Sequence, residues 1–385
     1  MYKGRGNSKD YEHSLEFLNN VFFSDNAPGD EQDFLSLLPK LYKKEYNHCE
    51  NNFIVSVNGE WKGAVGLYYS MLDIAGNPIK CAGIGNVAVG KDCRGKGYMK
   101  ECMKMAMNDA VESDADIALL GGRRQRYGYF SFEPSGTEYN FVFNELNLRH
   151  VYGSGFKSGI TVKEVTETDN DALDYIYERH SQQPIKAVRD REQLFDILCT
   201  WCRKPLVFLK DGEFVGYCLM FGNYNCVDEI AADSIESFRL IVPALLEYTD
   251  RNSIKIRLSP HQKECLDYLF SVCESSSTAH FEMMTVFNWK RFVNALLNYK
   301  AQLVKLCDGA VSFLIHGYKK DEAFSIVIKD NEVSVTDGAE SPVELTHKEA
   351  MSLFTSLYSI KKYDLAPNVA QWFPVEFRFP SADRV

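Results

Sequence analysis

The chain has 385 residues, too many for one ordinary hydrophobic core, so we expect two or three domains. Hydrophobic residues make up 45% of it and charged residues 25%, as in soluble globular proteins. The net charge of -10 disfavours nucleic acids as partners and favours cationic ones. Apolar runs are far shorter than the roughly 20 residues that cross a bilayer, and no secretory signal is visible at the start. These features predict a cytoplasmic protein that binds neither nucleic acid nor membrane.

Eleven cysteines are scattered along the chain, which predicts reduced and mostly buried thiols rather than a disulfide framework. The closest two are Cys199 and Cys202, in a stretch predicted to be helical, and no second pair follows them. No HExxH sequence occurs either. Because a zinc ion needs more ligands than this, no metal site is expected.

The first region, up to about Leu148, mixes helix and strand patterns. Turn residues such as Asn58-Gly59 separate its first strands. The helix after Gly97 carries one apolar face, formed by Met99, Cys102, Met103 and Ala106. The predicted helices are 8–23, 33–46 and 97–112, and the predicted strands are 52–57, 61–73, 80–89, 117–121 and 139–144.

The remaining chain divides at about Trp289. Before it, helices and glycine-punctuated strands recur, and the hairpin at 206–220 resembles the earlier one at 53–66. Because both have the pattern strand, turn and strand, a duplicated domain is predicted. After Trp289 a helix precedes predicted strands at 310–316, 323–329 and 333–336 and a helix at 346–359. The predicted domains are 1–148, 149–289 and 290–385.

The segment with the clearest chemistry, residues 87–99, lies between a predicted strand and a predicted helix. A glycine-rich turn at a helix start exposes unpaired backbone N–H groups at the positive end of the helix dipole. Gly95 and Gly97 let an anion approach the backbone, and Arg94 and Lys96 add positive charge. The pattern favours a pyrophosphate site, and the alternative is an ordinary glycine-rich turn.

This segment resembles the acetyl-CoA signature of the GNAT acetyltransferase superfamily, Q/R-x-x-G-x-G/A, with Arg94 and Gly97 in the first two fixed positions. Met99 departs from the final small residue. The resemblance implies that acetyl-CoA is the co-substrate, with its pantetheine arm along the strand and its pyrophosphate on the loop. The implied cofactor-binding residues are Val87, Ala88, Val89, Arg94, Gly95, Lys96, Gly97, Tyr98 and Met99.

A second match lies downstream, where Tyr-Gly-Tyr-Phe-Ser-Phe at 127–132 resembles the superfamily's Y-x-x-x-G-F segment, with Ser131 in place of glycine. In that family the tyrosine protonates the departing thiolate, and the resemblance implies this role for Tyr127. A phenol with a pKa of about 10 is protonated at pH 7 and suited to donate. The alternative is a core aromatic residue, and Tyr129 is the second candidate for the donor.

Over nearly its whole length the chain resembles the Eis (enhanced intracellular survival) family of acetyltransferases. The resemblance implies two GNAT-like mixed α/β domains in tandem, the second without the CoA signature, followed by an α+β domain like sterol carrier protein. It further implies N-acetylation of an aminoglycoside-like, polyamine or lysine amine by a homo-oligomer, with the hexamer as the family's assembly. In that family the C-terminal carboxylate acts as general base, which assigns this role to Val385 here. The alternative is that the aromatic-rich tail at 371–385 only packs on the body.

The acceptor side is predicted near the first helix, where such enzymes present aromatic and acidic groups to a cationic amine. The candidate residues are Phe22, Phe23 and Asp25, with Asp30, Glu31 and Asp33 in the same loop. The alternative for this acidic run is a solvated loop. The apolar stretch at 282–289 is predicted to be a core strand. The alternative function for the whole chain is a non-catalytic CoA- or lipid-binding protein.

Overall fold

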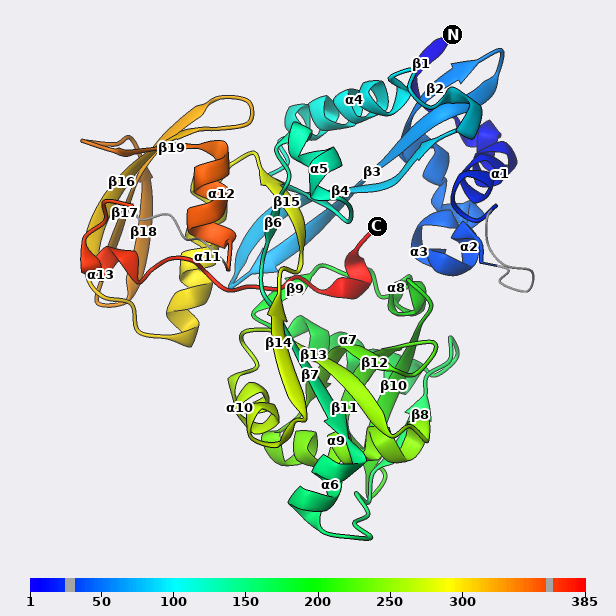
Figure 1. Ribbon diagram of the computed structural model, residues 1–385, viewed down its shortest axis with the longest axis vertical. Helices are drawn as coiled ribbons and strands as arrows, with labels where there is room; N and C mark the ends of the chain where they lie inside the picture. Colours follow the sequence, from blue (N-terminus) through cyan, green and yellow to red (C-terminus); the bar gives the residue numbers. More distant parts are fainter. Residues whose placement is uncertain (25–31, 358–362) are drawn as a thin grey trace. The chain divides into compact units, whose positions relative to one another are not determined.

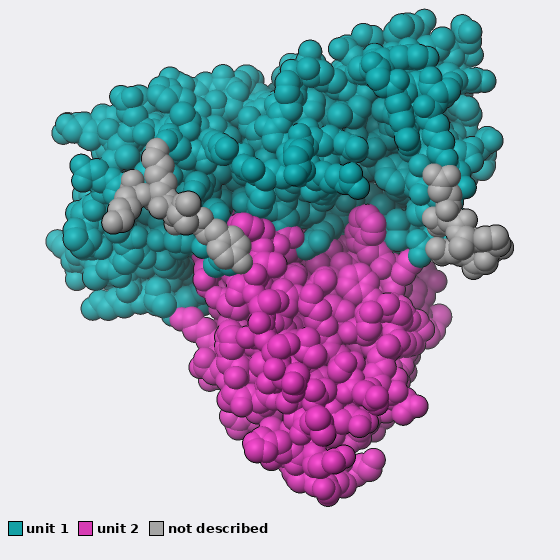
Figure 2. Space-filling model, viewed as in Figure 1, with its two compact units in different colours: residues 1–136, 282–375, 384–385 teal, residues 137–281, 376–383 magenta. Residues whose placement is uncertain are grey.

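The computed structural model describes residues 1–24, 32–357 and 363–385, which form two compact units. The first unit comprises residues 1–136, 282–375 and 384–385, and the second comprises 137–281 and 376–383 (Figures 1 and 2). Each unit is built around a mixed β-sheet, and the first unit contains a further, smaller sheet. The fold is therefore mixed α/β with several sheets.

The main sheet of the first unit follows the strand order β1-β2-β3-β4-β5-β15-β6. All neighbours on this path are antiparallel except β4 and β5, which are parallel. Its strands are β1 (Tyr2–Arg5), β2 (Asn52–Val57), β3 (Glu60–Ile74), β4 (Asn77–Val89), β5 (Ile117–Leu120), β6 (Glu133–Ser135) and β15 (Glu282–Val286). Its helices are α1 (Tyr11–Phe22), α2 (Phe34–Leu37), α3 (Pro39–Tyr42), α4 (Tyr98–Glu112) and α5 (Arg124–Tyr127).

Helix α4 covers this sheet with the apolar face that the sequence predicts. Cys102, Met103 and Ala106 are fully buried in one core cluster with residues of β2 to β5, and Met99 packs against it half-buried. The spacing of these residues follows the helical period, so burying them fixes which side of α4 faces the sheet.

The sheet of the second unit follows the order β8-β10-β11-β12-β13-β7-β14, and here only β12 and β13 are parallel. Its strands are β7 (Glu138–Asn144), β8 (Thr161–Glu164), β10 (Arg203–Lys210), β11 (Glu213–Phe221), β12 (Cys226–Ala232), β13 (Ser253–Leu258) and β14 (Ser275–Ala279). The unit also contains α6 (Glu145–Tyr152), α7 (Asn170–Ser181), β9 (Ile185–Ala187), α8 (Leu194–Cys199), α9 (Ile235–Thr249) and α10 (Lys263–Val272).

The two sheets share one topology, and each contains a strand from the other half of the sequence. In the first sheet the antiparallel neighbour of β5 is β15, which follows the second unit's strands in the chain (Figure 1). In the second sheet the equivalent neighbour of β13 is β7, which precedes them. The structure thus places β7, whose residues lie within 1–148, in the sheet of the second unit. It places β15, whose residues lie within 149–289, in the main sheet of the first unit. The division into three domains stays a prediction.

The two similar hairpins have identical registers. Strands β2 and β3 pair Val55 with Gly63, then shift by one residue before Ser56 pairs with Trp61. Strands β10 and β11 pair Phe208 with Gly216 and shift at the same place. A β-bulge at the same position of both hairpins is the structural counterpart of their sequence similarity.

The smaller sheet, of order β18-β17-β16-β19, belongs to the C-terminal part of the first unit. It comprises β16 (Gly309–His316), β17 (Asp321–Lys329), β18 (Glu332–Asp337) and β19 (Val343–Thr346), with helices α11 (Trp289–Leu303), α12 (His347–Thr355) and α13 (Pro367–Ala370). The chain then runs through buried Trp372, Phe377 and Phe379 to Val385, so the aromatic tail is packed rather than frayed.

Two predicted helical stretches are wrong in detail. The helix predicted at 33–46 breaks into α2, α3 and a 3-10 turn at Lys44–Tyr46. The break falls at Leu38, which precedes Pro39 and has a non-helical ψ of 60°; proline disfavours a helical residue before it. The stretch around Cys199 leaves the helix at that residue, and Cys202 has a left-handed φ of 54°.

Candidate functional site

Strand β4 parts from β5 inside the first sheet. Their parallel pairing runs from Cys81 to Ile84 and ends there. Next, the register between β4 and β3 shifts: Gly85 pairs with Gly66, but Ala88 pairs with Ala64. Asn86, with a φ of 39°, lies at this bulge of β4. Beyond the bulge Ala88 still pairs with β3, but in the described part of the sheet no strand lies on its other edge. The backbone of Val87, Ala88 and Val89 therefore offers an open edge on which an extended ligand can form a strand.

The loop after β4 leads into the N-terminus of α4. Gly95 and Gly97 have φ of 79° and 82°, and an added Cβ at either would meet no atom within 4 Å. Arg94 to Gly97 are exposed. The amides of Cys93 and Lys96 donate inside the loop, to the carbonyls of Gly90 and Cys93. The positive end of the 15-residue helix α4 and two cations thus face solvent at this turn, an arrangement suited to a diphosphate.

Tyr127 ends helix α5 and lies in the core cluster of the first unit, 5% exposed. Its ring packs on Gly122, where an added Cβ would lie 2.4 Å from Cε2. Burial raises the pKa of Tyr127, and Arg126 opposes part of the effect. The phenol is therefore held in its protonated form at neutral pH, as an acid catalyst requires.

The second candidate donor, Tyr129, has the opposite environment. It is 64% exposed, and Lys100 Nζ lies 4.0 Å from the centre of its ring. Hydrogen bonding and charge from Lys100 lower the pKa of Tyr129. Tyr129 is therefore exposed beside a cation, whereas Tyr127 is enclosed in the core.

The C-terminal residue Val385 lies on β4. A Cβ added to Gly83 would come within 2.7 Å of Val385 Cγ2, and one added to Gly85 within 3.2 Å of its carboxyl carbon. Val385 is half-buried there. Glycines at these two positions leave the room that the last residue of the chain occupies. The structure therefore brings the terminal carboxylate beside the strand that continues into Val87, Ala88 and Val89.

Sequence reasoning missed Glu282, the first residue of β15, because the surrounding stretch reads as an apolar core strand. Its side chain is 7% exposed and lies against Gly121, with Oε1 3.3 Å from a Cβ added there. Arg384 Nε approaches Oε2 at 3.4 Å. Burial raises the pKa of Glu282, against the attraction of Arg384 and Lys40. The one signal in the sequence was a single carboxylate at the head of an otherwise apolar strand.

The predicted acceptor residues Phe22 and Phe23 belong to a row of aromatic rings. Both rings contact Phe34, at centroid distances of 5.2 and 5.4 Å, and Phe34 contacts Tyr42 at 5.0 Å. Tyr42 in turn reaches Tyr68 on β3, hydroxyl to hydroxyl, at 3.4 Å. Phe22 is 44% exposed, so the row connects the surface with the sheet.

The acidic candidates of that region are only partly described. Asp25, Asp30 and Glu31 lie outside the described residues. Asp33 caps α2, accepting from the amide of Ser36 at 2.7 Å. Its carboxylate therefore has a structural role at a helix start.

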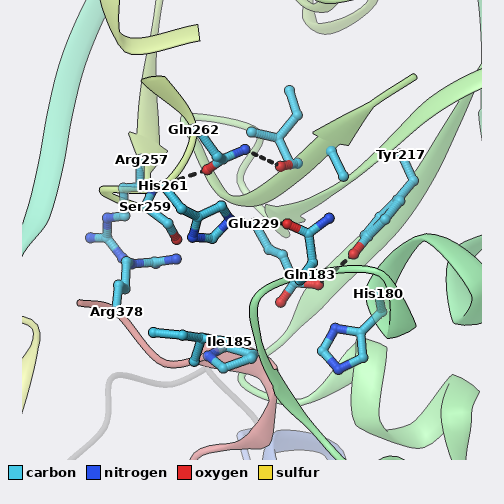
Figure 3. Close-up of a pocket in the computed structure, with 13 residues that line it drawn as sticks. His180, Gln183, Ile185, Tyr217, Glu229, Arg257, Ser259, His261, Gln262 and Arg378 are labelled. Atoms are coloured by element: carbon cyan, nitrogen blue, oxygen red, sulfur yellow. Dashed lines mark hydrogen bonds between the residues drawn. The ribbon is translucent and has the colours of Figure 1, made fainter. Parts of the chain in front are cut away.

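The equivalent opening in the second unit is filled by the protein itself. Strands β12 and β13 pair only at Cys226 and Val227. Where they part, Gln262 Nε2 donates to the carbonyl of Ile230 at 2.8 Å (Figure 3). The remaining cavity is about 30 Å³, room for a water molecule or two rather than a pantetheine arm. No glycine occurs between β12 and α9, so this unit also lacks the loop.

A metal site requires several ligating side chains close together, and a membrane-spanning helix must be long and apolar. Within residues 1–24, 32–357 and 363–385, His, Cys, Asp and Glu do not gather into a group able to hold a metal ion. None of the helices described is both long and apolar enough to cross a membrane. All eleven cysteines are described and carry free thiols.

Residues 5–134, which all belong to the first unit, match the family profile of the acetyltransferase (GNAT) domain. Among solved structures, a GCN5-related N-acetyltransferase from Anabaena variabilis is similar at 13% identity and a TM-score of 0.67, over 98% of both chains. Eis1 from Mycobacterium abscessus is similar at 14% identity and a TM-score of 0.62, over 100% of this chain and 99% of that one.

A GCN5-related N-acetyltransferase from Kribbella flavida gives 16% identity and a TM-score of 0.63, over 91% of this chain and 88% of that one. No curated protein matches the chain in sequence. At such identities the likeness to solved structures shows the fold. Together with the matched domain it supports acyl transfer from a CoA thioester as the general activity.

Proposed function

We propose that the chain is an N-acetyltransferase that moves an acetyl group from acetyl-CoA to the amine of a cationic acceptor. The observation that carries the proposal is the path of β4, which leaves β5 after Ile84 and ends in the loop of Gly95 and Gly97 at the start of α4. The open edge receives the pantetheine arm and the loop receives the diphosphate. Acetyl-CoA is thereby laid along one strand and one helix end.

The reaction is a direct attack of the neutral amine on the thioester carbonyl. A C–N bond forms, the C–S bond breaks, and the sulfur leaves with the proton of Tyr127. An α-carboxylate is a weak base at pH 7, so that of Val385 orients the amine and passes its released proton to water. Holding both reactants in place supplies much of the rate. No covalent acyl-enzyme is required, and solvent returns the proton to Tyr127.

The acceptor class follows from the charge and the aromatic row. A cation is attracted by the excess of 53 acidic over 43 basic residues, and rings such as Phe22 and Phe23 stabilise a cation at their faces. We therefore propose an aminoglycoside-like, polyamine or lysine amine as acceptor.

The identical hairpin registers and sheet orders support two GNAT-like domains in tandem. The sterol-carrier-protein-like identity of the C-terminal part, a homo-oligomer such as a hexamer, and a cytoplasmic location are proposed with them.

The proposal is tested by measuring free thiol released from acetyl-CoA in the presence of an amine panel that includes spermidine, kanamycin and a lysine peptide. Amine-dependent thiol release at a rate well above hydrolysis is expected. If acetyl-CoA stabilises the protein in a thermal-shift measurement but no amine releases thiol, the chain is a CoA-binding protein. Stabilisation by fatty acids alone would make it a lipid-binding protein.

A further inference from the structure

We propose that Glu282 is a positioning residue that holds the C-terminal carboxylate in the site by anchoring the side chain of Arg384. This inference rests on the proposed role of the Val385 carboxylate. The proposal gives a function to the buried Glu282 carboxylate, which has no part in the proposed binding of acetyl-CoA or in proton donation to the thiolate.

Glu282 has a rigid and central place in the first sheet. Strand β15 lies between β5 and β6, with Met283 paired to Leu120 on one side and Pro134 on the other. Because Leu120 is the last residue of β5, Glu282 lies beside the residue that follows this strand, and its carboxylate contacts Gly121. The ring of Tyr127 packs against the next residue, Gly122. The carboxylate is thus fixed beside the element that holds the proposed acid.

The last residues of the chain are held one after another. In the second unit Asp383 accepts hydrogen bonds from Arg189, with Oδ2 at 2.8 Å from Nη2. In the first unit Arg384 Nε lies 3.4 Å from Glu282 Oε2, and Val385 rests on Gly83. Because Arg384 directly precedes Val385, fixing its side chain restricts where the terminal carboxylate can point.

The opposite charges of Glu282 and Arg384 favour their contact. A carboxylate that is nine-tenths buried is costly to leave unpaired, and removal of one partner of a buried ion pair is strongly destabilising. Arg384 is the cation in direct contact, with a side chain that is only 24% exposed. Detaching the tail would remove the nearer of the two cations that attract the buried Glu282 carboxylate, Arg384 and Lys40, so this carboxylate favours the seated tail.

The test compares Glu282→Gln and Arg384→Gln with the unaltered protein in two measurements. The first is the release of Val385 by a carboxypeptidase, followed by intact mass, which needs no activity. The second is thiol release from acetyl-CoA with spermidine, with kcat and KM measured separately for both substrates. A matched control is Asp116→Asn: Asp116 is also buried, pairs with Arg291 at 2.7 Å and lies at the opposite end of β5.

Both tail variants are expected to release Val385 about tenfold faster and to lose about tenfold in kcat, with the KM for acetyl-CoA unchanged within twofold. The double variant should be no worse than either single one, because both break the same contact. Asp116→Asn should lower the thermal midpoint yet leave both readouts unchanged. If Glu282→Gln does not fold, the result for Arg384→Gln tests the proposal by itself. This variant is expected to fold because the Arg384 side chain is partly exposed.

Unchanged Val385 release in both variants overturns the proposal. Losses of kcat that add in the double variant also overturn it, because the two residues would then act independently. So does loss of the acid limb of the pH–rate profile in Glu282→Gln alone, because Glu282 would then act on the substrate directly. Faster release of Val385 with unaltered kcat leaves the tail anchor intact but removes the terminal carboxylate from the mechanism. The two proposals can therefore fail separately.

Discussion

At the scale of single residues, the site depends on groups whose surroundings set their protonation. Tyr127 is enclosed by the core of the first unit, and burial raises its pKa. The nearby Tyr129 is exposed and bonded to Lys100, which lowers its pKa. The surroundings of two tyrosines two positions apart thus shift their pKa values in opposite directions, and only Tyr127 is enclosed in the core.

The residue-scale prediction for the acid is that Tyr127→Phe lowers kcat by roughly 10² with little change in acetyl-CoA affinity. Because burial raises the pKa of Tyr127, the kcat of the unaltered protein should not fall on its account below about pH 10. Steady-state thiol release against pH measures both effects. An unchanged kcat in the variant would exclude Tyr127 from proton transfer, and Tyr129→Phe serves as the control.

A second residue-scale prediction concerns acid stability. His48 is fully buried, Ser14 Oγ lies 2.8 Å from its Nε2, and burial lowers its pKa to about 4. The folded-state pKa is thus below the unfolded-state value of about 6.5, so the unfolded state takes up the proton first as pH falls. Between pH 7 and pH 5 this residue should therefore cost about 2 kcal/mol of stability.

Urea unfolding at the two pH values measures that loss, and His48→Gln should show a pH dependence smaller by the same amount. An equal pH dependence in both proteins would contradict the assigned cause.

At the scale of elements, β4 organises the site, and much of it could be predicted from the sequence. The turn at Gly76, the strand and the glycine loop before α4 carry local signals, since each needs a particular backbone conformation or periodicity. The structure confirms β4 over Asn77–Val89 and α4 over Tyr98–Glu112, within a few residues of the predicted bounds.

Other elements could not be predicted because their place depends on distant partners. The pattern of a strand tells which face is buried but not which sheet it joins, so the exchange of β7 and β15 was not foreseen. Glu282 was overlooked for the same reason, since its role arises only when β15 lies beside β5. The helix break before Pro39, by contrast, could have been predicted locally from the proline. The prediction of one helix over 33–46 gave more weight to the apolar pattern.

At the scale of the whole molecule, the end of the chain returns to the first sheet. Residues 376–383 pack within the second unit, where buried Arg378 contacts Glu138 at 3.2 Å, and residues 384–385 pack within the first. Val385 thereby lies against Gly83 of β4, about 300 residues earlier in the chain.

The prediction at this scale is that adding residues after Val385 lowers kcat by about tenfold or more, because an amide would replace the terminal carboxylate on β4. An equal extension before the exposed Met1 should leave kcat unchanged. Thiol release compares the two extended proteins. Full activity of the C-terminally extended protein would refute the role of the carboxylate.

The central claim is that the turn after Cys93 grips the diphosphate of acetyl-CoA, and calorimetric titration with acetyl-CoA tests it most directly. Gly97→Ala is compared with Gly76→Ala, since both glycines have nearly the same φ, 82° and 81°, and open space around them. Each should lose a similar stability, on the order of 1–2 kcal/mol. Only Gly97→Ala should weaken acetyl-CoA binding, by about tenfold or more, because only there would a Cβ lie between backbone and anion. Equal acetyl-CoA affinity in both variants, or no acetyl-CoA binding by the unaltered protein, would contradict the account.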